Sequence, residues 1–141
     1  MPTIGDILTA KGPDVIVAEC RATVSEAAKM MAHANVGSVI VTDSGQTLGI
    51  FTERDLLRRV IACRKDPSSV LLGEVMSSPV KSCRLGDEVQ DCADMLTKLR
   101  IRHLAVIEEG ELVGLIGLRD MLIAELRSSE ENIQALQPNA W

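Results

Sequence analysis

The stretch IFTERDLLRR, residues 50–59, decides the fold because it recurs as LIGLRDMLIA at residues 115–124. Each copy reads as the end of a strand followed by the start of an amphipathic helix. Shifting the chain by 65 residues aligns residues 15–57 with residues 80–122, with 10 identities in 43 positions and no gap. The chain is therefore predicted to contain two copies of one folding unit.

Both copies are expected to have the element order β-α-β-β-α, which places the chain in the α+β class. The first helix carries an apolar stripe at helical spacing in each copy: Val24, Ala27, Ala28 and Met31, then Val89, Cys92, Ala93 and Leu96. Cys92 is thus expected in the core. Strands are expected near residues 15–17 and 80, at 36–43 and 101–108, and at 47–51 and 112–116. Tight turns at Gly45 and Gly110 would join the last two strands of each copy, and helices would follow at 54–62 and 119–126.

The repeat also sets the expected domain boundaries. They are a first repeat with its lead-in at 1–62, a linker at 63–72, a second repeat at 73–126 and a tail at 127–141. The lead-in segments GDIL (5–8) and GEVM (73–76) match at an offset of 68 rather than 65, so the first copy carries about three extra residues around Lys11 to Asp14. Ile133 and Leu136 could extend a helix into the tail, which Pro138 would stop. The expectation for residues 127–141 is nevertheless a tail that is frayed or docked on a partner.

Composition narrows the class of protein. The 141 residues include only two aromatic side chains, Phe51 and Trp141, so the core must be aliphatic. The net charge of −5 and the lack of a dense basic run argue against nucleic-acid binding. No apolar run is long enough to span a membrane and no signal peptide is evident, so a cytoplasmic location is expected. The four cysteines lack zinc-ligand spacing and are expected to be free thiols, mostly buried, with no metal site.

Two roles are open for Thr52 and Asp55 at the start of the helix. As N-cap and third helical residue they match a capping box, in which the cap contributes about 1 kcal/mol. In the second copy Gly117 replaces Thr52 whereas Asp120 is kept, so the acid recurs without a capping hydroxyl. A carboxylate at a strand-to-helix junction can instead accept hydrogen bonds from both hydroxyls of a ribose. The repetition favours this second role.

Basic residues near the two acids indicate an anionic ligand. Arg54 and Arg119 lie in a first helical turn, where the helix dipole disfavours a cation unless an anion binds nearby. Arg102 and His103 fall in what should be a buried strand, where basic groups are costly unless they have partners. For the first pair the alternative explanation is a surface arginine that is solvated or paired with a carboxylate. For the second pair the alternative explanation is an interior hydrogen bond or salt bridge. Glycine-rich phosphate loops are absent, so any phosphate must be held by side chains.

Taken together, these features resemble a pair of cystathionine β-synthase (CBS) domains, the Bateman module. The resemblance rests on the β-α-β-β-α repeat, the GxxTxxD motif of Gly49, Thr52 and Asp55, and RHLAV at 102–106. The lead-in segments IGDIL and LGEVM are also similar, and the match extends from residue 3 to about residue 126. It implies two repeats packed through their sheets about a pseudo-twofold axis, with two clefts that commonly bind adenosine derivatives.

The resemblance also implies roles for individual residues. Thr52 and Asp55 would hold the ribose in the first cleft, with Arg54 beside them. Arg102 and His103 of the opposite repeat would reach the phosphate. The adenine would lie against four apolar residues: Val15, Ile16, Val36 and Ile50.

The second cleft departs from the family pattern. Asp120 is retained there, but Gly117 stands where a hydroxyl is expected. Gly37 and Ser38 also offer less charge than their counterparts in the other repeat. This cleft is expected to be weaker, empty or suited to an uncharged group.

The function implied is that of a non-enzymatic regulatory or sensor protein without a catalytic cofactor or catalytic residue. Its ligand would be AMP, ADP, ATP, NAD or S-adenosylmethionine, and it would form a homodimer that signals to an unknown downstream protein. Two alternatives stay open. One is an enzyme of nucleotide metabolism, since such pairs occur inserted in inosine-monophosphate dehydrogenase, and the other is a structural interaction module with empty clefts.

Overall fold

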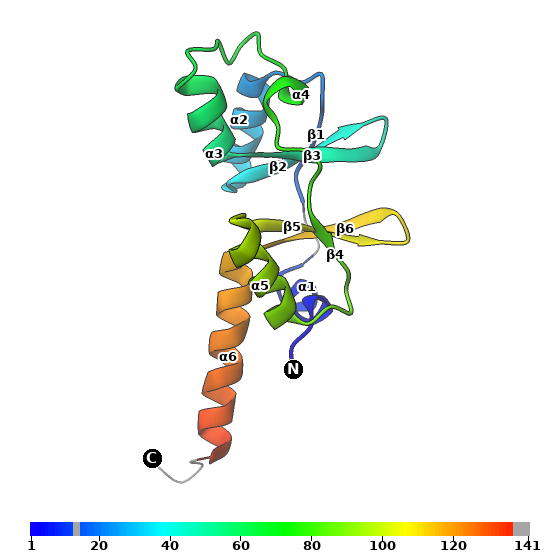
Figure 1. Ribbon diagram of the computed structural model, residues 1–141, viewed down its shortest axis with the longest axis vertical. Coiled ribbons are helices and arrows are strands. Elements are labelled where there is room, and N and C mark those ends of the chain that lie inside the picture. Colours follow the sequence, from blue (N-terminus) through cyan, green and yellow to red (C-terminus); the bar gives the residue numbers. More distant parts are fainter. Residues whose placement is uncertain (13–14, 137–141) are drawn as a thin grey trace. The chain divides into compact units, whose positions relative to one another are not determined.

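The computed structural model describes residues 1–12 and 15–136, and it confirms the α+β class and the repeated element order (Figure 1). The first copy comprises β1 (Val17–Glu19), α2 (Val24–Ala34), β2 (Ser38–Asp43), β3 (Gln46–Thr52), α3 (Glu53–Asp55) and the π-helix η1 (Leu56–Ile61). The second comprises β4 (Ser82–Cys83), α5 (Val89–Leu99), β5 (His103–Glu108), β6 (Glu111–Gly117) and α6 (Leu118–Leu136). A short helix precedes each copy: α1 (Ile4–Lys11) and α4 (Leu72–Val75).

The chain packs as two compact units that do not coincide with the two repeats. The central unit is Val15–Val80, and the terminal unit combines Met1–Asp14 with Lys81–Trp141. As a result, α1 precedes the first repeat in sequence but belongs to the terminal unit, and α4 precedes the second repeat but belongs to the central unit. The boundaries expected above follow sequence similarity, whereas the units follow packing.

Each unit has a three-stranded mixed sheet with the same pairing. In the central unit β1 is parallel to β2, and β2 is antiparallel to β3; β4, β5 and β6 repeat this order in the terminal unit. The hairpins turn at Ser44-Gly45 and Glu109-Gly110, where all four residues have positive φ, between 50° and 83°. Positive φ at both central residues defines the type I′ turn that suits a two-residue hairpin. The predicted turns at Gly45 and Gly110 are therefore confirmed.

The long strands begin two residues later than the sequence predicted, at Ser38 and His103. The reason is the way the preceding helices end. Asn35 and Arg100 cap α2 and α5 in the left-handed conformation, with φ of 56° and 57°. The next two residues lead the chain from that cap into the strand.

Each unit has its own apolar core, which is aliphatic apart from cysteine and methionine and, in the central unit, Phe51. In the central unit the helices pack on one face of the sheet through a buried set made of Ala18, Val24, Ala27, Met31, Val39, Val41, Phe51, Val60, Leu72 and Val75. In the terminal unit the set is Ile4, Ile7, Leu8, Cys83, Val89, Cys92, Leu96, Leu104, Val106, Ile116 and Met121. Cys92 is thus a core residue, as its position in the stripe predicted. The lead-in helices α1 and α4 supply three and two side chains to these cores.

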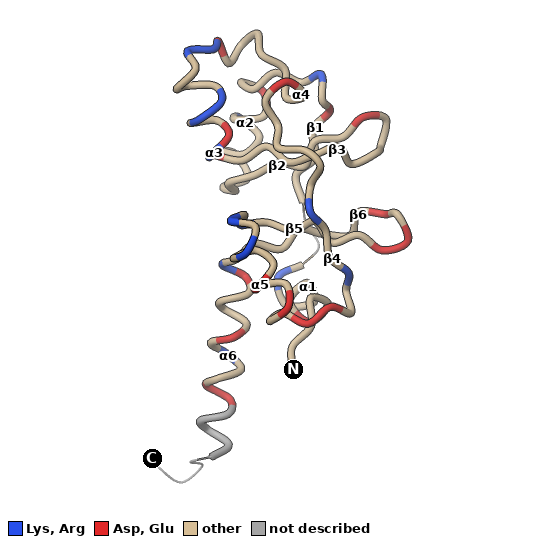
Figure 2. Tube along the Cα trace, in the orientation of Figure 1, with Lys and Arg blue, Asp and Glu red and all other residues tan. Residues whose placement is uncertain are grey.

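Helix α6 runs through Leu136, well beyond the end of the repeat at about residue 126. Residues 127–136 are therefore helical rather than frayed, while Pro138 and Trp141 lie outside the described residues. Among the helices of residues 1–12 and 15–136, none is long and apolar enough to cross a membrane. Figure 2 shows acidic and basic segments interspersed along the tube of each unit, in keeping with the lack of a dense basic run.

Candidate functional site

Thr52 and Asp55 meet where β3 passes into α3, and they form a complete capping box. The backbone N–H of Asp55 donates to Thr52 Oγ1 at 3.2 Å, and the backbone N–H of Thr52 donates to Asp55 Oδ2 at 3.0 Å. The Thr52 hydroxyl also donates to the same Oδ2, at 3.2 Å. The capping interpretation of this motif is therefore confirmed in the central unit, and any ligand must share the carboxylate with it.

The other oxygen of Asp55 is held from the segment that follows α4. The Ser77 hydroxyl donates to Asp55 Oδ1 at 2.9 Å, and Arg59 Nε lies 3.6 Å from the same atom. Arg59 also donates from Nη1 to the Met76 carbonyl at 2.7 Å. Asp55 is only 5% exposed, so its carboxylate joins the helix start to residues 76–77 inside the central unit.

Gly49 explains how residues 76–77 come so close. Ile50 and Ser77 form an isolated antiparallel bridge with N···O distances of 2.9 and 2.8 Å. A Cβ on Gly49 would collide with the Ser77 carbonyl oxygen and would lie 3.1 Å from the Met76 sulfur. The glycine of the GxxTxxD motif is therefore required by packing of the lead-in segment.

The terminal unit repeats this arrangement with different groups. A Cβ on Gly114 would lie 2.8 Å from Leu8 Cδ2 of α1. Asp120 Oδ2 accepts from the Gly117 N–H at 2.9 Å and from Lys11 Nζ, also at 2.9 Å. The expectation that Asp120 has no capping role without a hydroxyl is wrong, because the carboxylate half of a capping box needs only a backbone N–H.

Arg102 and His103 differ from each other in exposure. Arg102 precedes β5 and is exposed, so the expectation that both residues lie in a buried strand is wrong for Arg102. His103 begins β5, is half-buried and pairs with Gly117 across the hairpin. A Cβ on Gly117 would lie 3.6 Å from both His103 Cδ2 and Asp120 Oδ2. The structure thus brings His103 close to Asp120 within the terminal unit, and a role of the basic pair toward a ligand of Asp55 stays a prediction.

The apolar residues assigned to the adenine all belong to the central unit, as Thr52 and Asp55 do. Ile50 is buried, and Val15 and Ile16 are half-buried. Val36 is 41% exposed, ahead of β2. Arg54 is exposed in α3, in the turn that contains Asp55. Their contact with a ligand stays a prediction.

Three side chains that contact the two acids were not predicted from the sequence: Arg59, Ser77 and Lys11. Arg59 stands four residues after Asp55, a spacing that brings side chains together on a helix. Ser77 directly follows the lead-in segment GEVM, and Lys11 opens the three-residue insertion in the first copy. The offset change from 65 to 68 was therefore the one available signal that the lead-in segments differ near the two acids.

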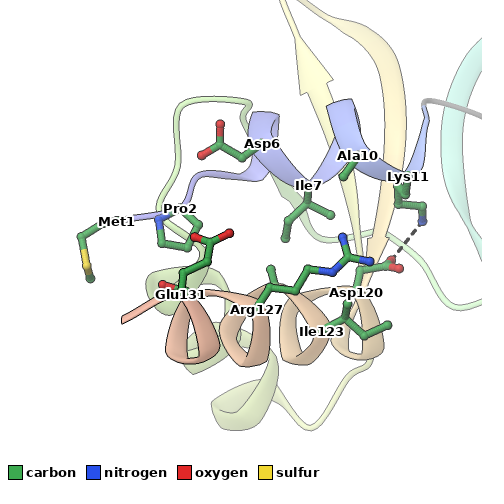
Figure 3. Close-up of a pocket in the computed structure, with 12 residues that line it drawn as sticks. Met1, Pro2, Asp6, Ile7, Ala10, Lys11, Asp120, Ile123, Arg127 and Glu131 are labelled. Carbon is green, nitrogen blue, oxygen red and sulfur yellow. Dashed lines mark hydrogen bonds and ion pairs between the residues drawn. The ribbon is translucent and has the colours of Figure 1, made fainter. Parts of the chain in front are cut away.

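Lys11 and Asp120 also lie at one end of a groove between α1 and α6, with a volume of about 620 Å³ (Figure 3). Ile7 and Ile123 line its sides, and Arg127 points along it toward Asp120. Within the described side chains, no group of three or more His, Cys, Asp or Glu residues is placed to hold a metal ion. The groups that contact the two acids are hydrogen-bond donors and cations.

Comparison with known proteins agrees with this geometry. The CBS domain family model matches residues 4–62 and 72–127. The CBS domain-containing protein CBSX3, mitochondrial, of Arabidopsis thaliana is 30% identical over 95% of this chain and 69% of its own length. A solved structure of a protein with CBS domains from Burkholderia ambifaria MC40-6 has a TM-score of 0.87 at 29% identity, covering 89% of this chain and 95% of that one.

A further solved structure, of the CBS domain pair of protein MJ0100, contains 5′-methylthioadenosine and S-adenosyl-L-methionine. It has a TM-score of 0.78 at 23% identity and covers 92% of this chain and 98% of that one, which shows a shared fold. The family model accounts for most of the chain, with one match in each repeat. The chain therefore belongs to the CBS domain family and carries a pair of these domains.

Proposed function

We propose that this protein binds an adenosine-containing nucleotide through Thr52 and Asp55 and acts as a non-enzymatic regulatory protein. One observation carries the proposal: each oxygen of the Asp55 carboxylate accepts a hydrogen bond from a hydroxyl. Thr52 donates to Oδ2 at 3.2 Å and Ser77 donates to Oδ1 at 2.9 Å. A ribose offers the same pair of donors through its 2′- and 3′-hydroxyls. The diol can therefore take over contacts that the protein already makes with its own hydroxyls.

The surroundings of Asp55 support a nucleoside ligand. Ile50, Val15 and Ile16 belong to the same unit and offer apolar surface for the adenine. We assign Arg54, in the turn that contains Asp55, to the phosphates. The CBS pair of MJ0100 holds adenosine ligands, which supports AMP, ADP, ATP, NAD or S-adenosylmethionine as the compounds to test. A downstream protein would respond through different affinities for the free and bound forms.

Isothermal titration calorimetry with these five compounds tests the proposal. Asp55→Asn keeps the shape of the side chain but removes its charge. Hydrogen bonds to charged groups contribute about 1.5–3 kcal/mol, so the variant should bind about 10- to 100-fold more weakly. Asp94→Asn, an exposed residue of α5 that accepts a bond from Gln90 at 2.9 Å, is the matched control.

Because Asp55 also caps a helix, the thermal unfolding of each ligand-free variant must be measured alongside. Equal affinity of the Asp55→Asn variant and the wild type would place the ligand elsewhere. Binding of none of the five compounds would leave the structural interaction module as the better account. Turnover of a nucleotide by the pure protein would favour the enzyme.

We also propose that two copies of the chain associate through exposed apolar helix residues. These residues recur at the repeat offset in both units: Met30 with Met95, Leu57 with Leu122, and Ile61 with Leu126. Leu57 and Leu122 are 61% and 51% exposed. Each unit therefore carries exposed apolar helix residues that a second copy of the chain, with the same residues, can cover.

A further inference from the structure

The carboxylates of the two repeats are held by groups of different charge. Asp55 accepts from hydroxyls and a backbone N–H, with Arg59 Nε more distant at 3.6 Å. Asp120 accepts from the ammonium group of Lys11 at 2.9 Å (Figure 3). Lys11 also donates to the Leu115 carbonyl at 2.9 Å. The ammonium is therefore fixed between two acceptors of the strand and helix that carry the Asp120 site.

The packing of α1 in the terminal core fixes the position of Lys11. Lys11 is the last residue of α1, and α1 is anchored in the terminal core by Ile4, Ile7 and Leu8. The side chains of Lys11 and Asp120 are 34% and 25% exposed. The ion pair is thus partly shielded from water, and the packing of α1 holds Lys11 beside Asp120.

We propose that Lys11 occupies Asp120 in place of a ribose and so confines nucleoside binding to the Asp55 site. The inference rests on the proposed function. At Asp55 a ribose hydroxyl replaces the Ser77 hydroxyl, so that one uncharged donor takes the place of another. At Asp120 it would replace an ammonium ion, which adds the attraction between opposite charges to the hydrogen bond that it donates. The displaced ammonium would also lose the Leu115 carbonyl.

The groove beside the ion pair is the reason for testing variants that lack the Lys11 ammonium group. Its volume of about 620 Å³ lies next to both partners, so removal of the ammonium leaves open space beside Asp120. Lys11→Met keeps the length of the side chain without its charge. Arg127 points along the groove toward Asp120 (Figure 3), so the double variant K11M/R127M also removes the one guanidinium drawn there. Lys98→Met, an exposed substitution on α5 of the same unit, is the control.

Calorimetric titration with adenosine and with AMP measures the number of sites. The wild type and K98M should bind one nucleoside per chain, and K11M and K11M/R127M should bind two. The added site should bind about 10- to 100-fold more weakly in K11M/D120N, and the original one should weaken by the same factor in K11M/D55N. Adenosine lacks a phosphate, so the comparison with AMP separates the diol from any attraction of the phosphate to Lys11.

The outcomes separate this inference from the proposed function. Three outcomes would contradict the role of Lys11 but leave the proposed function intact. They are a single site in the wild type and in both Lys11 variants, two sites in the wild type, or weaker binding of AMP by K11M than by the wild type. Another outcome is binding by K11M, no binding by the wild type and weakened binding by K11M/D120N. That result would support the proposed role of Lys11 and reject the site at Asp55. No binding by any variant would reject both.

Discussion

Asp55 and Asp120 show how two aligned residues acquire different properties from their neighbours. Both carboxylates accept a backbone N–H at the start of a helix, from Thr52 and Gly117. The difference between them comes from Ser77 and Lys11, which are distant in sequence. The sequence motif shows the acidic residue and its spacing. The residue that contacts the carboxylate from elsewhere in the chain is determined by packing.

The cysteines give a second residue-scale result, with a testable pH dependence. Cys83 and Cys92 are 4% and 2% exposed. Burial, with the neighbouring Cys92 thiol adding to it, raises the pKa of Cys83 from 9.0 to about 12. Burial also raises the pKa of Cys92. Both side chains are therefore neutral thiols at physiological pH, as the prediction of buried free cysteines requires, whereas Cys63 is exposed.

Since the unfolded Cys83 thiol loses its proton near pH 9.0 and the folded one near pH 12, the folded state binds more protons in between. Its contribution to the free energy of unfolding should be constant below about pH 9 and should fall as the pH rises toward 12. Urea unfolding across this range should show a shallower fall for Cys83→Ala than for the wild type. The exposed-site variant Cys63→Ser should keep the wild-type slope. Identical slopes for Cys83→Ala and the wild type would contradict the assignment.

At the scale of elements, the lead-in segments are the parts that position both acids. Residues 76–77 pair with Ile50 beside Gly49, and α1 packs against Gly114. The two glycines face different atoms: a backbone carbonyl oxygen at Gly49 and the end of a leucine side chain at Gly114. A leucine side chain can move aside, whereas a paired backbone cannot.

Substitution of the two glycines by alanine should therefore lower the free energy of unfolding by different amounts. Overpacking typically costs about 1–3 kcal/mol, and we expect Gly49→Ala near the upper end and Gly114→Ala near the lower end. The free energy of unfolding from urea titration of the two variants measures the difference. Each variant is the matched control of the other, because the glycines align in the repeat. A cost for Gly114→Ala equal to or above that of Gly49→Ala would refute this account.

The elements also show how far the sequence could be interpreted. Internal repetition and apolar spacing predicted the strand and helix order, the turns at Gly45 and Gly110, and the burial of Cys92. The motif placed Thr52 beside Asp55. The sequence did not show which core receives α1 or α4, because both cores are apolar and accept the same side chains. For that reason the contacts of Ser77 and Lys11 could not be predicted.

At the scale of the whole molecule, the exposed apolar residues provide the test of self-association. In Leu57→Glu/Leu122→Glu a charge is placed on the proposed contact surface of each unit. Burying an unpaired charge is strongly unfavourable, so the dissociation constant of the dimer should rise by more than about 10-fold, as for central interface residues.

Sedimentation velocity over a range of concentrations measures this constant. Leu85→Glu changes an apolar residue of 36% exposure outside the proposed surface and should leave the constant unchanged. A wild-type chain that sediments as a monomer at all concentrations would rule out the second copy as the partner.

The two-piece composition of the terminal unit has a consequence for the order of events on the ribosome. Val15–Val80 is one continuous stretch and can assemble as soon as it has emerged. Helix α1 emerges before the central unit, yet its core partners, such as Leu96, Leu104 and Ile116, are translated after that unit. Ile4, Ile7 and Leu8 must therefore stay unburied while the rest of the chain is synthesised. The apolar side chains of this segment therefore lack their core partners until residues up to Met121 have been translated, and Lys11 can reach Asp120 only then.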